Sequence, residues 1–120
     1  MPQLIMGVPL QQLAREGRTN MPEVLLQFST PVAGPDGRLY EARAIGAETA
    51  DRLWHGWIEF SAGDGGELVA TDRETTQPNR IDTVYWATGL TQIYLEGALI
   101  RALDVSRSRH AAQHLQTHSS

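Results

Sequence analysis

The stretch LWHGWIEF at residues 53–60, followed by the turn GDGG at 63–66, decides the fold of this chain. The side chains of the first stretch alternate between two sides of an extended backbone, with Trp54, Ile58 and Phe60 on one side and His55 and Glu59 on the other. This alternation predicts a strand with one buried face. The glycine-rich turn predicts that the chain reverses into a partner strand at 67–71.

Trp57 interrupts this alternation, because it places a large aromatic ring on the otherwise polar face of the strand. An aromatic side chain at such a position is typical of a sheet face that is partly covered. We expect the N-terminal segment or another subunit to cover this face.

A second hairpin precedes this one in the sequence. Residues 23–30 are rich in strand-forming side chains, and three of them would share one face: Val24, Leu26 and Phe28. The turn GPDG at 34–37 combines a fixed φ with residues that tolerate positive φ, and a strand over 38–45 follows it. The two hairpins together predict a meander of four antiparallel strands, and the polar residues 72–80 after it are predicted to form a loop.

A long C-terminal helix is predicted after this loop. Asn79 is a good N-cap, and Asp82 follows three residues later in the first turn, so the helix should begin near Arg80. Its first part carries an apolar stripe formed by Ile81, Val84 and Tyr85. Thr88 and Gly89 weaken the pattern, which predicts a kink or a break near Gly89.

The fold class is therefore α+β, with a four-stranded antiparallel meander packed against a long C-terminal helix. Residues 1–20 are predicted to be an appendage with a short helix, because Pro9 suits a first helical turn and Gly17 can end it. Residues 21–104 form the predicted compact domain. Residues 105–120, rich in Ser, Arg, His and Gln, are predicted to be a flexible tail.

Composition and charge exclude several classes of function. The 120 residues contain no Cys, which removes disulfides, thiolate nucleophiles and Cys-based metal sites. All ten basic residues are Arg, which excludes a Schiff-base or P-loop lysine and is typical of a GC-rich bacterial genome. The net charge of −4 disfavours binding to nucleic acid and to anionic membranes. Without a signal peptide or apolar span, we predict a cytoplasmic protein.

The polar loop before the helix is a candidate ligand site. The candidate side chains are those of Arg73, Glu74, Gln77, Asn79 and Arg80, facing the aromatic ring of Trp54 or Trp57. Guanidinium and amide groups ahead of a helix N-terminus can bind an anion such as phosphate or carboxylate. The favoured interpretation is structural, however: Asn79 caps the helix, Pro78 sets the turn, and the charged residues pair with each other.

Two further sets of side chains are candidates for catalysis and metal binding. His55 and Glu59 lie four residues apart in a strand, which separates them by about 13 Å and rules out direct contact. His110, His114 and His118 would align along one side of a helix, but three ligands in line do not make a preorganised site. No catalytic residue, metal or cofactor is therefore predicted.

The second half of the helix has more apolar side chains than one small sheet can cover. We therefore predict a small non-catalytic module for protein–protein interaction or homodimeric assembly, with a second copy or another protein as its partner. The predicted interface consists of Tyr94, Leu95, Ala98, Leu99, Ile100 and Leu103. The alternative is a protein, or an enzyme, that binds a small anionic ligand through the loop 73–80.

Overall fold

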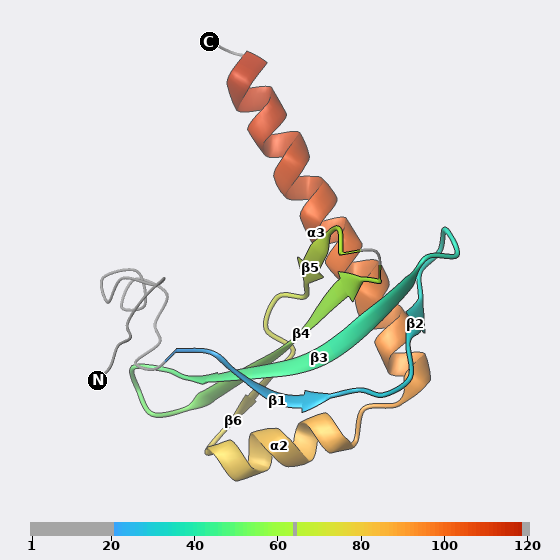
Figure 1. The fold of residues 1–120 in the computed structure, drawn as a ribbon. Coiled ribbons are helices and arrows are strands. Elements are labelled where there is room, and N and C mark those ends of the chain that lie inside the picture. Colours follow the sequence, from blue (N-terminus) through green and yellow to red (C-terminus); the bar gives the residue numbers. More distant parts are fainter. Residues whose placement is uncertain (1–20, 64, 119–120) are drawn as a thin grey trace, which may run out of the picture.

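The computed structural model describes residues 21–63 and 65–118, and it shows an open antiparallel sheet with two helices (Figure 1). The predicted α+β class and antiparallel sheet are confirmed. The predicted short helix within residues 1–20 lies outside the described residues, as does any contact of that segment with Trp57.

Six strands form the sheet: β1 (Glu23–Gln27), β2 (Val32–Ala33), β3 (Leu39–Glu48), β4 (Trp54–Ala62), β5 (Leu68–Ala70) and β6 (Thr75–Gln77). The long strands β3 and β4 are central, and the order across the sheet is β1-β3-β4-β5. β2 also pairs with β3, and β6 also pairs with β4. The prediction of four strands is too low, because two further short strands, β2 and β6, also pair along the outer edges of β3 and β4.

Strand β6 lies inside the segment that the sequence predicts as a loop. Thr75, Thr76 and Gln77 pair with the first three residues of β4, although none of them is apolar. Two β-branched threonines suit a strand, and an edge position does not require apolar side chains on both faces. The prediction of a loop over 72–80 is therefore wrong at these three residues.

Strand β1 contains a bulge that changes the direction of its side chains. Val24 lies opposite Ile45, whereas Leu26 lies opposite Ala44, so one residue is inserted between these two pairs. Ala44 and Ile45 are neighbours in β3, so their side chains point to opposite faces of the sheet. Leu26 and Val24, which lie opposite them, therefore also point to opposite faces. The prediction that Val24 shares a face with Leu26 is wrong.

The turn between β3 and β4 is closed by Thr49. Its backbone N–H donates to the Leu53 carbonyl at 2.7 Å, and the Arg52 N–H donates to the Thr49 carbonyl at 3.1 Å. The Thr49 hydroxyl also donates to the carboxylate of Asp51, and this hydrogen bond lowers the pKa of Asp51. Arg52 takes a positive φ of 67°, a conformation that costs a non-glycine residue about 1–2 kcal/mol.

Two helices follow the sheet, α2 (Arg80–Thr88) and α3 (Gln92–His118). The Asn79 side chain accepts a hydrogen bond from the Asp82 N–H at 2.8 Å, so the predicted N-cap and the helix start at Arg80 are confirmed. The predicted break near Gly89 is also confirmed, because α2 ends at Thr88. α3 continues through residues 105–118, the predicted tail, and extends beyond the sheet (Figure 1).

Both helices pack on one face of the sheet. Buried side chains that share this face are contributed by the central strands and by α3: Tyr40, Ala42, Ile58, Phe60, Leu95, Ala98, Leu99 and Ala102. α2 packs close to the strands at Gly56, where an added Cβ would lie only 2.8 Å from the Trp86 ring. Small residues on the sheet therefore allow the helices to approach closely.

The opposite face of the sheet is formed by the odd-numbered residues of β3 and β4, and we call it the open sheet face. Ile45 and Trp57 lie opposite each other on it, as do Arg43 and Glu59. Among the described residues, neither helix packs on this face. Ile45 is buried there beside the half-buried Trp57.

Candidate interaction surface

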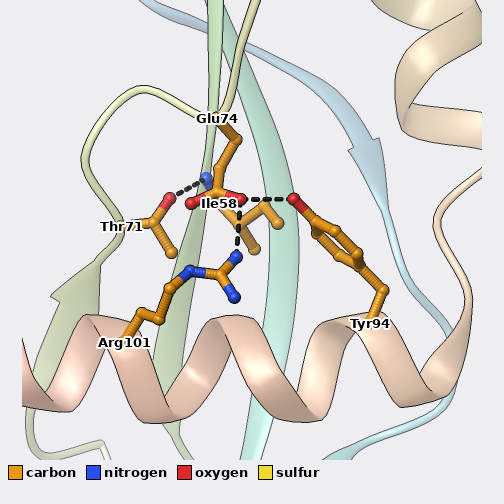
Figure 2. A network of polar contacts seen from close by, with 5 residues as sticks. All are labelled: Ile58, Thr71, Glu74, Tyr94 and Arg101. Carbon is orange, nitrogen blue, oxygen red and sulfur yellow. Dashed lines mark hydrogen bonds and ion pairs between the residues drawn. The ribbon is translucent and has the colours of Figure 1, made fainter.

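The segment between β5 and β6 is fixed to α3 by a polar network around Glu74 (Figure 2). The Glu74 carboxylate accepts hydrogen bonds from the Tyr94 hydroxyl and from Arg101 Nη2, the latter at 2.6 Å. Arg101 also lies over the Tyr94 ring, 5.4 Å from its centre. Since the Glu74 side chain is only 11% exposed, these two partners compensate the burial of its charge.

The backbone positions Glu74 for this role. The Glu74 N–H donates to the Gly56 carbonyl at 2.8 Å, and the Thr71 N–H donates to the Ile58 carbonyl at 2.9 Å. The Thr71 hydroxyl also accepts a hydrogen bond from the Ile58 N–H (Figure 2). Both anchors lie on β4, so the short segment between them must stand out from the sheet toward α3. Its Asp72 also pairs with Arg109 of α3 at 3.6 Å.

The surroundings of Tyr94 change the pKa of its hydroxyl group. Burial of the phenol raises its pKa, and the hydrogen bond and negative charge of Glu74 raise it further. The protonated hydroxyl is therefore the form that the folded protein favours. A tyrosine held in its neutral form as a hydrogen-bond donor supports a structural role for this network.

The remaining residues of the predicted ligand site do not meet at one place. Asn79 caps α2, and Arg80 pairs with Glu23 of β1 at 2.6 Å. Gln77 donates to the hydroxyl of its neighbour Thr75, and Arg73 is exposed to solvent. These contacts match the structural interpretation of the loop, in which its polar groups cap the helix and form ion pairs.

Trp57 is also separated from Glu74. Trp57 lies opposite Ile45 on the open sheet face, whereas Glu74 turns toward α3 on the helix-covered face. The structure therefore does not bring the aromatic ring to the polar loop, and the two cannot line one pocket.

The predicted interface residues fall into two groups. Leu95, Ala98 and Leu99 are buried against the sheet of the same chain, so they are core residues and cannot contact a partner. Tyr94 and Ile100 are exposed, and the half-buried Leu103 packs at the edge of the core. The apolar pattern predicts all of these residues as surplus, because the pattern alone does not show that one complete side of α3 packs on the sheet.

Three strongly exposed apolar residues were not among the predicted interface residues. Ile93 is 81% exposed, Tyr85 71% and Ile81 67%. On α2 the buried positions are Thr83 and Ala87, so the apolar stripe of this helix points outward. The four-residue spacing of Ile81 and Tyr85 was visible in the sequence, but a stripe of this kind normally indicates the core side of a helix.

We use the name outer helix surface for four exposed apolar residues, Ile81 and Tyr85 of α2 and Ile93 and Ile100 of α3. On α2 a shallow groove of about 220 Å³ runs along the side chains of Arg80, Ile81, Val84, Tyr85 and Thr88. On α3, Gly97 lies one turn from both Ile93 and Ile100. A Cβ built at Gly97 would come near only the Arg101 guanidinium, at 3.8 Å, so there is space beside Gly97 on this side of α3.

A larger groove of about 470 Å³ lies between the β2–β3 turn and α3. Its charged side chains balance, since Arg38 and Arg107 are offset by Asp36 and Glu67. Arg38 lies 4.0 Å from Glu67, and Arg107 pairs with Asp104 at 3.3 Å. The groove therefore offers no net charge that would select an anionic or cationic ligand.

Within residues 21–63 and 65–118, no helix is long and apolar enough to cross a membrane. Among the side chains that the structure describes, those of residues 21–63 and 65–111, no three His, Asp or Glu groups are arranged to hold a metal ion. His110 Nδ1 lies 3.0 Å from the Ser106 carbonyl, while the side chains of His114 and His118 lie outside the described residues. Comparisons with protein-family models, curated proteins and solved structures find no significant match to this chain.

Proposed function

We propose that the protein is a non-catalytic interaction module, and that its outer helix surface is the contact site for another protein. The supporting observation is that Ile81, Tyr85 and Ile93 each expose more than two thirds of their area on the outer sides of α2 and α3. Burying such side chains contributes about 1.5–3 kcal/mol each, so a partner would gain considerably by covering them. Aromatic and aliphatic anchors of this kind dominate binding at protein interfaces.

The polar groups near this surface favour the same interpretation. Glu74, Tyr94 and Arg101 are bonded to one another, and Asn79 bonds to the α2 backbone. Groups already engaged in this way fix the shape of the helix layer and need not be rearranged on binding. A preformed surface loses less entropy when it binds.

Site-specific photocrosslinking tests this proposal. A benzophenone amino acid at position 93 should crosslink to one predominant protein in native cells, identified by mass spectrometry. The same group at Ser108, an exposed polar position of α3, is the matched control and should give only background. A crosslinked second copy or a different protein would both support an interaction surface. Equal background at the two positions would overturn the proposal.

A further inference from the structure

The groove between the β2–β3 turn and α3 is bordered by a buried tyrosine whose hydroxyl has no protein partner. Tyr40 lines this groove and is only 1% exposed. The Arg38 guanidinium lies over its ring, 5.7 Å from the ring centre. Among the side chains that the structure describes, those of residues 21–63 and 65–111, none forms a hydrogen bond with the Tyr40 hydroxyl. A buried hydroxyl of this kind is satisfied by water or by a bound molecule.

The position of Tyr40 in the sheet directs its side chain toward this groove. Tyr40 shares a face of the sheet with Ala42 and Phe60, so its ring projects from β3 toward the helix layer. The groove lies between the same end of β3 and α3, where Leu103 and Ser106 border it. Its volume of about 470 Å³ falls within the range of about 300–1,000 Å³ that is usual for small-molecule sites. A partner for the hydroxyl would therefore come from the groove.

The two walls of the groove carry opposite charges. The wall on the sheet side has two carboxylates, Asp36 and Glu67, against one guanidinium, Arg38, whereas the α3 wall has Arg107. Among the described residues, no ion pair joins the two walls: Arg107 pairs with Asp104 of its own helix at 3.3 Å, and Glu67 lies 4.0 Å from Arg38 on its own wall. Opposite charges that line a groove without bridging it suit a molecule between them that carries both charges.

The other lining residues narrow the class of this molecule. Pro35 of the turn and the half-buried Leu103 of α3 add apolar surface to the groove. The balanced charges of the walls disfavour a ligand with a large net charge, because one wall would repel it. A small molecule with one carboxylate, one ammonium and a short apolar group matches all of these features. Free amino acids with apolar side chains have this chemistry.

We propose that this groove binds a free α-amino acid with a small apolar side chain. The ligand carboxylate would accept a hydrogen bond from the Tyr40 hydroxyl and pair with Arg107, while the ligand ammonium would lie at the wall that carries Asp36 and Glu67. This goes beyond the proposed function, because it assigns a small-molecule site that shares no residue with the outer helix surface.

Isothermal titration calorimetry of the full-length chain with L-leucine tests the proposal. L-Leucine should bind at one site per chain. Two analogues each lack one of its charges, since 4-methylpentanoate has no ammonium and 3-methylbutylamine has no carboxylate. Each analogue should bind at least about tenfold more weakly, because it loses a charged hydrogen-bond partner. No binding of L-leucine up to millimolar concentration would overturn the proposal, as would equal affinities for the three compounds.

Tyr40→Phe tests whether the buried hydroxyl takes part in binding. The variant keeps the aromatic ring in the core and should retain its melting temperature, because the hydroxyl has no partner among the described residues. Its affinity for L-leucine should fall about tenfold. Tyr85→Phe, which removes a hydroxyl from the outer helix surface, is the matched control and should bind L-leucine normally. Unchanged binding by Y40F would mean that the hydroxyl contacts water only, and it would overturn the proposal.

Arg107→Gln tests the α3 wall without touching the core. Arg107 is exposed, so the variant should fold normally and lose about tenfold in affinity for L-leucine. Arg109→Gln, on the same helix but outside this groove, is the matched control and should bind as the unaltered protein does. Equal affinities of R107Q and R109Q would overturn the proposal. Ile93→Lys should also leave L-leucine binding unchanged, so this site and the outer helix surface can fail independently.

Discussion

Two neighbouring residues of β4 show how differently the two sheet faces are built. Phe60 is fully buried beneath α3, whereas Glu59 points to the open sheet face and pairs with Arg43. On the covered face the shape of each side chain determines stability, since the interior is close-packed. On the open sheet face Arg43 and Glu59 are half-buried and compensate each other's charge. Substitutions on the two faces should therefore differ in both size and kind.

The largest expected difference is between Phe60→Ala and Glu59→Ala. Removing the Phe60 ring should lower the free energy of unfolding by about 3–5 kcal/mol, because it leaves a cavity beneath α3. Removing the Glu59 carboxylate, which is 24% exposed and pairs with the 35% exposed Arg43, should cost less, about 1 kcal/mol. Urea denaturation of the two variants measures both values. Similar losses would show that the faces are not as distinct as the structure indicates.

A smaller effect is expected for Gly56→Ala, which tests how closely α2 approaches the covered face. The new methyl group would lie 2.8 Å from the Trp86 ring and 2.9 Å from the Thr75 methyl group. Relieving this overlap should destabilise the fold by about 1–3 kcal/mol. Thermal unfolding measures the change. Gly63→Ala, whose Cβ would meet nothing nearer than the Leu39 carbonyl at 3.8 Å, is the control and should have little effect.

Asn79→Ala tests the cap that starts the helix layer. The substitution removes the side-chain acceptor for the Asp82 N–H, and it should cost about 1 kcal/mol of stability. Asn79→Asp keeps an acceptor at this position and should retain most of the stability. Chemical denaturation distinguishes the two variants. Equal losses would mean that Asn79 does not stabilise α2 through this bond.

The smallest effect concerns Tyr94, at the margin between the covered face and solvent. Because its pKa is raised on folding, its contribution to stability is fully present below its ordinary pKa of 10.0 and is lost as pH rises through the folded value. Tyr94→Phe should therefore reduce the loss of stability between pH 9 and higher pH, roughly in proportion to the shift. Glu74→Gln should lower the pKa of Tyr94 partway, which ultraviolet titration of the phenol measures. An unchanged titration would show that Glu74 does not act on Tyr94.

Local signals predicted several elements correctly. The Gly-rich turns, the alternation over 53–60 and the Asn79 cap depend on neighbouring residues, and the structure has strands and a helix start where they indicate. Gly89 likewise follows the last residue of α2. Such features are predictable because backbone conformation and side-chain spacing are set within a few residues.

The candidate surfaces were less predictable. Leu95, Ala98 and Leu99, predicted at an interface, are core residues. Ile81 and Tyr85 are exposed, although the apolar spacing of α2 suggested that they would face the core. The buried position Thr83 explains this reversal. Its hydroxyl donates to the Asn79 carbonyl at 2.8 Å, so a polar residue can occupy the inner side of α2 without an unpaired donor.

The sequence by itself determined that this is an α+β chain without cysteine or lysine, with hairpins at two Gly-rich turns and a helix starting after Asn79. Only the tertiary structure decided which side of each helix packs on the sheet, and that both helices pack on the same face of the sheet. The physical reason is that turns and caps are local, whereas burial depends on contacts between residues far apart in the chain. The spacing of apolar residues shows which of them share a face of a helix or strand, but it does not show which face another element will cover.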